Sequence, residues 1–276
     1  MAAADDRSAI AYLTDHDLVV IAADNTRTVL PFDSHSCLAG HADRLYVAPG
    51  GGHSIGVWGE QANIAGDLFG HAGSHTTASC IVDLATRRER ALADAGGLLV
   101  WRTATDLVAA LPDARDRDHC AATGATRACF DRGSGAIVTS TNARYPARDV
   151  GELWGVALSA DGKRFAYWGR TGSDRPIRNR AIVIDLTSGA ELARFDESYN
   201  GAIAWIELDP RGSRDLLVVD WLDEGSGPHN GRVRRLTGDG KVTHEHRTRN
   251  IPDAAYWTTP GEYWAVESCY AQRVKL

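Results

Sequence analysis

Short apolar runs separated by glycine-containing turns recur along the chain and predict β-strands. Residues 156–169 read VALSADGKRFAYWG, in which two apolar runs flank a tight ADGK turn. Residues 45–59 read LYVAPGGGHSIGVWG, with the same aliphatic strand, a glycine-rich turn and a similar ending. Apolar runs joined by such turns are typical of β-hairpins. We interpret the two segments as copies of one motif.

A second hairpin motif alternates with the first. Weaker copies of the first motif lie at residues 206–221, 256–266 and 130–139. The second motif, IVIDLTSGAELARFD, occupies residues 182–196 and has copies at 81–94 and 99–113. Two hairpins give four antiparallel strands per unit, recurring about every 40 to 50 residues, which is the arithmetic of propeller blades.

The turns of the first motif resemble a known repeat class. ADGK at residues 160–163 and DPRG at 209–212 resemble the Pro-Asp-Gly-Lys-like turn of WD-repeat-type and related bacterial propeller repeats. The resemblance is good over about residues 150–250 and fair over 40–113. It implies an all-β fold, a single β-propeller of antiparallel four-stranded blades.

The repeat count predicts six blades, with five or seven as alternatives, because residues 114–150 match the repeat poorly. We expect residues 1–7 to be a disordered stretch and residues 8–276 to form the propeller domain. Strands within residues 9–32 and 254–274 are expected to share one blade, since a shared blade leaves no bare sheet edge.

Charge and cysteine content narrow the function classes. A net charge of -6 disfavours general binding to nucleic acid or to an anionic membrane surface. No apolar run approaches the roughly 18 residues that a membrane span needs, so membrane insertion is not expected. The alanine-rich start followed by charge resembles a mature exported protein, periplasmic or secreted, with a cytoplasmic protein as the alternative. Cys120 and Cys129 could form a disulfide in an oxidising compartment or remain buried thiols.

Two motifs invite a catalytic or metal interpretation. Residues 52–56, GHSIG, match the G-x-S-x-G nucleophile elbow, but the following residues are strand-like, and the elbow requires a helix there. We interpret this motif as a hairpin turn. Asp67, His71 and His75 are spaced so that a helix would align them as metal ligands, although the glycines between them disfavour a helix. We treat them as weak metal candidates and expect no cofactor.

The tryptophans and the loops point to different roles. Trp58, Trp168, Trp221 and Trp264 recur at matching places in the repeat, which favours packing between blades.

The connections from second to third strands are long, at residues 59–77, 169–180 and 222–231, and all lie on one face. We predict a partner-binding surface there, formed by Arg170, Asp174, Arg175, Arg178, Arg180, Asp223, Glu224, His229 and Asn230. These opposite charges could instead pair with one another.

The sequence favours a non-catalytic protein-binding propeller. An inhibitor or immunity-type protein that binds a secreted enzyme or toxin through its long-loop face would fit this pattern. The alternative is a propeller hydrolase or lyase that acts on a carbohydrate or lactone in an axial pocket, where a small-molecule ligand could bind. A fold of this kind does not decide between binding and catalysis.

Overall fold

The computed structural model is built from antiparallel β-sheets. It describes residues 2–31, 42–62, 75–92, 98–109, 119–171, 178–197, 201–222, 230–267 and 270–276, and no α-helix occurs in these ranges. The chain divides into two compact units, Met1–Arg115 and Asp116–Leu276, which we call unit 1 and unit 2.

Unit 1 contains three sheets, A to C. Sheet A is formed by β1 (Ala2–Ala3), β2 (Ala9–Leu13), β3 (Asp17–Ala22) and β4 (Arg27–Pro31), and sheet B by β5 (Ala42–Val47), β6 (Ser54–Ala62), β7 (His75–Asp83) and β8 (Glu89–Ala91). Sheet C consists of β9 (Leu99–Trp101) and β10 (Leu107–Ala109). Leu18 and Val20 of sheet A pack against Ile55 and Val57 of sheet B, so the apolar faces of neighbouring sheets form the core.

Unit 2 contains four sheets, D to G. Sheet D is formed by β11 (Cys120–Thr123), β12 (Thr126–Asp131), β13 (Ala136–Thr139) and β14 (Arg144–Pro146), and sheet E by β15 (Glu152–Leu158), β16 (Arg164–Arg170), β17 (Asn179–Asp185) and β18 (Glu191–Glu197). Sheet F is formed by β19 (Gly201–Leu208), β20 (Leu216–Leu222), β21 (Asn230–Leu236) and β22 (Val242–Thr248), and sheet G by β23 (Ala254–Thr259), β24 (Glu262–Glu267) and β25 (Tyr270–Lys275).

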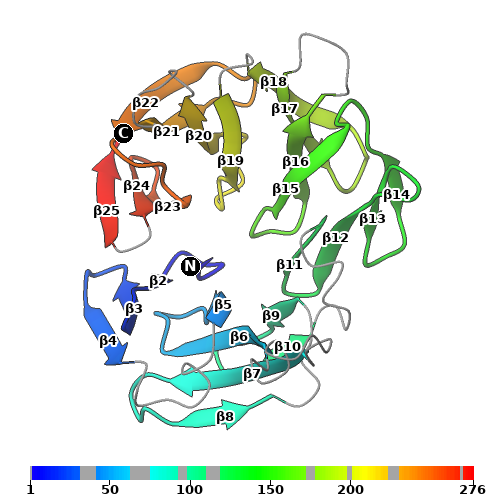
Figure 1. Cartoon of the computed structure of the whole chain (residues 1–276). Helices are drawn as coiled ribbons and strands as arrows, with labels where there is room; N and C mark the ends of the chain where they lie inside the picture. Colours follow the sequence, from blue (N-terminus) through cyan, green and yellow to red (C-terminus); the bar gives the residue numbers. More distant parts are fainter. Residues whose placement is uncertain are drawn as a thin grey trace, which may run out of the picture. The chain divides into compact units, whose positions relative to one another are not determined.

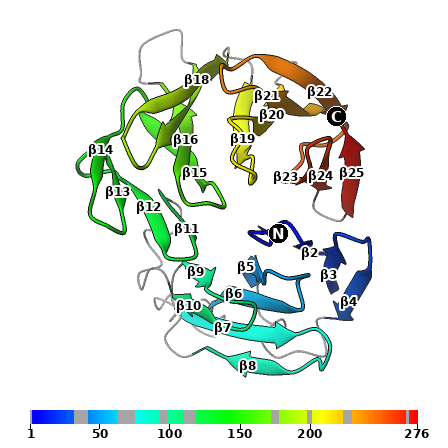
Figure 2. The same cartoon turned by 180° about the vertical axis from the view of Figure 1, so that it is seen from behind.

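Successive sheets of unit 2 pack through their apolar faces. Their first strands, β11, β15, β19 and β23, are neighbours in that order (Figures 1 and 2). Trp168 and Phe195 of sheet E pack against Ile206 and Val218 of sheet F. Three four-stranded meanders and one three-stranded meander, stacked in this way, have the topology of propeller blades.

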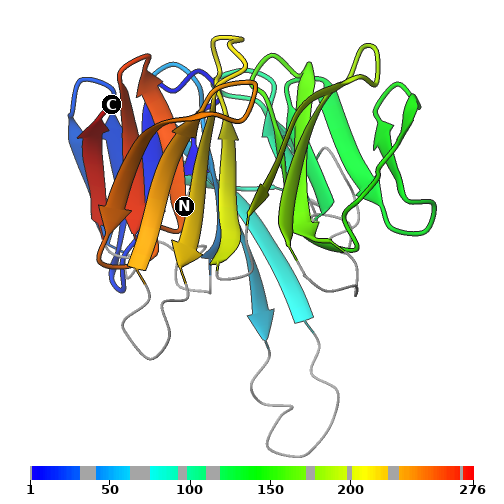
Figure 3. The ribbon, with the colours of Figure 1, turned by 90° about the horizontal axis from the view of Figure 1, so that it is seen from above.

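Short connections join the first strand of each sheet in unit 2 to the second, and those of sheets D, E and F are linked by hydrogen bonds. Figure 3 shows the β17–β18 and β19–β20 turns on the same side of unit 2. Thr123 in sheet D donates its hydroxyl to the carbonyl of Ala160, over 3.3 Å. Arg164 of sheet E donates to the carbonyls of Asp209, over 2.6 Å, and of Ser213. The repeat motif thus supplies the contact between one sheet and the next.

A bulge at the same place confirms that the Trp58 and Trp168 segments are equivalent. The register of the first two strands shifts between Ala42 and Arg44 in sheet B, where Arg44 pairs with Trp58. In sheet E it shifts just before Gly155, which pairs with Trp168. Both tryptophans are buried between sheets, as the packing interpretation predicts. Trp221 lies elsewhere in the repeat, because the matching residue at the sheet F bulge is Val219.

Three expectations concern the ends of the chain and the number of blades. Residues 1–7 were expected to be disordered; in the structure β1 pairs with β2 and Ala4 is fully buried. β1–β4 form one sheet and β23–β25 form another, so a blade shared by the chain ends is not confirmed. The described residues form seven sheets, and the count of six blades is not confirmed either.

Residues 114–150, the poorest match to the repeat, contain the complete sheet D over their described part. Short strands and turns without the tryptophan ending explain why the sequence pattern is weak there.

Candidate functional site

The long connection of sheet E leaves from a sheet end rich in charge. Arg170, the last residue of β16, pairs with Asn179, the first residue of β17. Arg178 lies at the stem of the connection, where its backbone amide donates to the Thr171 hydroxyl over 3.1 Å and the Thr171 amide donates to the Arg178 carbonyl. This stem fixes the backbone of Arg178 next to the sheet. We call this end of the sheet, where β16 ends and β17 begins, the long-loop end.

Four of the nine predicted partner-binding residues lie in the described part of the chain, and five lie outside it. Arg170, Arg178 and Arg180 all lie at the long-loop end of sheet E, as expected. Asn230 begins β21 and pairs with Leu222 at the corresponding end of sheet F. Asp174, Arg175, Asp223, Glu224 and His229 lie outside the described residues. The combined surface of the two predicted loops stays a prediction.

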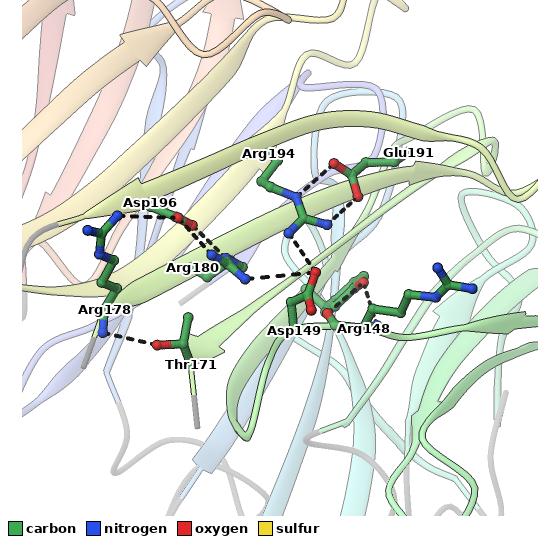
Figure 4. Close-up of polar contacts among 9 residues, drawn as sticks. Arg148, Asp149, Thr171, Arg178, Arg180, Glu191, Arg194 and Asp196 are labelled. Carbon is green, nitrogen blue, oxygen red and sulfur yellow. Dashed lines mark hydrogen bonds and ion pairs between the residues drawn. The ribbon is translucent and has the colours of Figure 1, made fainter. Parts of the chain in front are cut away.

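The described arginines pair with carboxylates of their own sheet. Arg180 of β17 contacts Asp196 of β18 at two points, Nε to Oδ1 at 2.6 Å and Nη2 to Oδ2 at 2.7 Å (Figure 4). Arg178 Nη1 lies 4.0 Å from Asp196 Oδ2. Arg170 Nη1 lies 3.6 Å from Glu152 Oε2. The observed partners of these three arginines, Asp196 and Glu152, are outside the predicted set. Pairing between the two predicted loops stays untested, because Asp174, Asp223 and Glu224 lie outside the described residues.

Three further residues, which the sequence did not single out, extend the cluster. Arg194 of β18 contacts Glu191 through Nε and Nη2, at 2.8 and 2.7 Å. Its Nη1 donates to Asp149 Oδ2 at 2.6 Å, and Arg180 Nη1 lies 3.8 Å from the same oxygen (Figure 4). Asp149 comes from the connection between β14 and β15. We name this set the sheet E ion-pair network: Asp149, Arg178, Arg180, Glu191, Arg194 and Asp196.

All carboxylates of the network are ionised at neutral pH. The hydrogen bond from Arg194 lowers the pKa of both Asp149 and Glu191, and the hydrogen bond from Arg180 lowers the pKa of Asp196. The same contacts raise the pKa of Arg180 and Arg194. Groups shifted in these directions do not exchange protons near pH 7, so the network is suited to charge recognition rather than to general acid–base catalysis.

Sheet F carries a second ion-pair cluster at its long-loop end. The buried carboxylate of Asp220 on β20 accepts hydrogen bonds from Arg232 Nε at 2.7 Å and Nη2 at 3.0 Å, and from Arg234. Arg232 also lies 3.5 Å from Glu245 on β22. Asp220 is 1% exposed and Arg234 is 5% exposed, so their ion pair lies in the interior of unit 2 rather than on a free surface.

The two catalytic or metal interpretations have different outcomes. Ser54 of GHSIG begins β6 directly after a hairpin turn, and a strand follows it where an elbow needs a helix. The hairpin interpretation is therefore confirmed. Asp67 and His71 lie outside the described residues, but His75 begins β7 and pairs with Ala62, which contradicts the helical alignment for this residue. Within the described ranges, no group of three or more His, Cys, Asp or Glu could hold a metal ion.

Cysteine pairing agrees with one of the two alternatives. Cys120 and Cys129 face each other across the β11–β12 hairpin and form a disulfide, with a Cα–Cα distance of 4.0 Å. Cys80 in β7 is disulfide-bonded as well.

In the part of the chain that the structure covers, no helix has both the length and the apolar character that a membrane span requires.

Comparisons give no sequence family for the chain, since neither a family model nor a curated protein matches it. Solved structures similar to it include hydrazine synthase from Kuenenia stuttgartiensis, at 12% identity and a TM-score of 0.42, covering 95% of this chain and 71% of that one. TolB from Acinetobacter baumannii follows at 16% identity and a TM-score of 0.43, covering 90% of this chain and 54% of that one.

The β-propeller domain of the Trilobed protease from Pyrococcus furiosus is similar at 12% identity and a TM-score of 0.34, covering 84% of this chain and 68% of that one. This chain spans only about half the length of the TolB chain. At these TM-scores the likeness adds no argument, and the description of the sheets as blades rests on the strand topology of the chain itself.

Proposed function

We propose that the chain is a non-catalytic protein-binding β-propeller that contacts its partner through the long-loop end of its sheets. The sheet E ion-pair network carries this proposal. Arg178, Arg180 and Asp196 lie at the long-loop end, and the network continues along the sheet through Asp149 and Arg194 to Glu191, which pairs with Ile184 near the other end. Arg178 is 52% exposed and Asp149 is 45% exposed. Charge patterns of this kind favour selective association and fast encounter with a partner of complementary charge.

The disulfides support a place outside the reducing cytoplasm. Disulfide bonds persist in the periplasm and in secreted proteins, and they are rare in the cytosol of mesophiles. An inhibitor or immunity-type protein that neutralises a secreted enzyme or toxin is the form of binding protein that fits this compartment and a recognition surface built from fixed charges. The hydrolase or lyase alternative stays a prediction from the sequence.

The test is a capture followed by a binding measurement. The intact disulfide-bonded chain is used as bait in a periplasmic extract of the native host, and the captured protein is identified, purified and titrated against bait variants. We expect Arg178→Glu to raise the Kd at least about tenfold, because a rim charge is reversed where the partner must approach.

Lys163→Glu is the matched control. Lys163 is exposed on the same sheet but lies in the turn between β15 and β16, at the opposite end from Arg178. It should change the Kd by less than about twofold, as expected for a surface charge outside the interface. Equal effects of the two reversals, or none from Arg178→Glu at unchanged thermal stability, would remove the long-loop end as the binding surface.

A further inference from the structure

Asp149 differs from the other carboxylates of the sheet E ion-pair network because it belongs to no strand. Asp196 and Glu191 lie on β18. Asp149 instead reaches Arg194 and Arg180 from the connection between β14 and β15 (Figure 4). The two arginines thus have ion-pair partners on β18 of their own sheet, whereas Asp149 contacts them from a connection outside the strands.

Both arginines keep a strand-borne partner without Asp149. Arg180 retains its two-point contact with Asp196, and Arg194 retains its two-point contact with Glu191. Because each guanidinium carries more donors than these contacts use, Nη1 of both residues points to the Asp149 carboxylate. The two arginines thus form a preformed binding site for one carboxylate.

The hold on Asp149 is weak enough for exchange. Its side chain is 45% exposed, and ion pairs in that setting contribute little to stability. Its backbone has a φ of 64°, a left-handed conformation that is uncommon outside glycine but tolerated by aspartate. A competing carboxylate can therefore take its place between the arginines at small cost.

We propose that Asp149 occupies the position of an acidic side chain of the partner, so that binding exchanges an internal carboxylate for an external one between Arg180 and Arg194. This inference rests on the proposed protein-binding function and names its chemistry. The ligand is an acidic protein segment, and the exposed Arg178, whose Nη1 is 4.0 Å from Asp196, offers a contact for a second acidic residue.

The neighbouring charges favour such a segment over a phosphate polymer. Glu191 and Asp196 stay in place and stay ionised, since Arg194 and Arg180 lower their pKa values. A densely charged polyanion would meet these two carboxylates as well as the arginines, and like charges held close together repel. A peptide with separated carboxylates can contact the arginines and keep its own charges away from Glu191 and Asp196.

The experiment titrates the intact chain with a fluorescein-labelled peptide of alternating glutamate and glycine at low ionic strength, followed by anisotropy. Asp149→Asn frees the site, so we expect it to lower the Kd by about threefold, the scale of one exposed ion pair. Arg194→Gln removes the donor and should raise the Kd by at least about threefold.

Asp131→Asn is the matched control. Asp131 forms an exposed ion pair with Arg144 at 3.1 Å on sheet D, so its removal changes the net charge equally without touching the site. If Asp131→Asn tightens binding as much as Asp149→Asn, only net charge is at work and the exchange is refuted. Tighter binding of inorganic polyphosphate than of the peptide, with the same dependence on Asp149, would also overturn it.

The captured partner separates this inference from the proposed function. If Arg178→Glu weakens binding of that partner and Asp149→Asn leaves it unchanged, protein binding at the long-loop end stands and the carboxylate exchange fails. If neither variant alters binding of the partner, the long-loop end is not the interface. The peptide titration then reports only on the carboxylate-binding site between Arg180 and Arg194.

Discussion

Arg180 on β17 and Asp196 on β18 lie directly opposite each other and join through two parallel contacts of 2.6 and 2.7 Å. Two-point arginine–carboxylate pairs are stronger and more specific in geometry than single contacts. The Arg180 side chain is 19% exposed and that of Asp196 is 26% exposed, so water screens this pair less than a pair on the open surface. It is the fixed point around which the sheet E ion-pair network is arranged.

A double-mutant cycle of Arg180→Ala and Asp196→Ala should give a coupling free energy of about 1 kcal/mol, the upper range for partly exposed pairs. The free energy of unfolding is measured by urea titration for the wild type, both single variants and the double variant. Arg144 and Asp131 form the comparison, since their single contact of 3.1 Å is 56% and 41% exposed. A coupling there as large as that of Arg180 and Asp196 would contradict the importance of the two-point geometry.

The stabilisation by Arg194 should depend on pH in the acid range. The folded chain holds the pKa values of Glu191 and Asp149 below their ordinary values through hydrogen bonds from Arg194. Their contribution is therefore present above the unfolded pKa values, about 4.3 and 3.9, and is lost as the pH falls through the lowered folded values.

The measurement compares urea unfolding of the wild type and Arg194→Gln between pH 7 and pH 2.5. The difference in unfolding free energy, up to about 1 kcal/mol at neutral pH, should close as the carboxylates become protonated. Arg132→Gln, a change at an exposed turn residue, controls for net charge and should show no such closure. A gap for Arg194→Gln that persists at the lowest pH would contradict the assignment.

Removing the Arg164 side chain should weaken unit 2. Its buried guanidinium donates to the carbonyls of Asp209 and Ser213 and joins sheet E to the β19–β20 turn. Arg164→Ala leaves those carbonyls without this donor, and we expect a loss of about 2 to 3 kcal/mol in the free energy of unfolding.

Lys163→Ala, next to it but exposed, should stay within about 0.5 kcal/mol of the wild type. Chemical denaturation of the three proteins in parallel decides the matter. Equal stability of Arg164→Ala and Lys163→Ala would mean that the contact between the turns contributes nothing.

Gly155 should not tolerate a side chain. A Cβ at this position would lie 2.2 Å from Cζ2 of Trp168, a buried ring that packs between sheets E and F. Gly155→Ala therefore forces the ring to move, at about 1 to 3 kcal/mol, as overpacking does in other cores.

Gly261→Ala serves as the reference, because a Cβ there meets nothing within 4 Å. Tryptophan fluorescence and thermal unfolding of both variants provide the readout. An unchanged unfolding midpoint for Gly155→Ala would show that the bulge can adapt around Trp168.

The sequence alone determined the local structure of this protein. Alternating apolar residues and glycine turns specified the hairpins, because these signals act within a few residues, and the segments at residues 45–59 and 156–169 were recognised as equivalent. The clustering of Arg170, Arg178 and Arg180 at one sheet end also followed from the positions of the strands and turns.

Only the tertiary structure decided which charges meet. Counting back from Ile184 and Glu191 would place Arg180 opposite Phe195, but a bulge between Val183 and Ile184 shifts the register by one residue. Asp196 then faces Arg180. Asp149 joins them from a connection between two sheets, so its position depends on how sheets D and E pack, and a single sequence carries no local signal for such a contact.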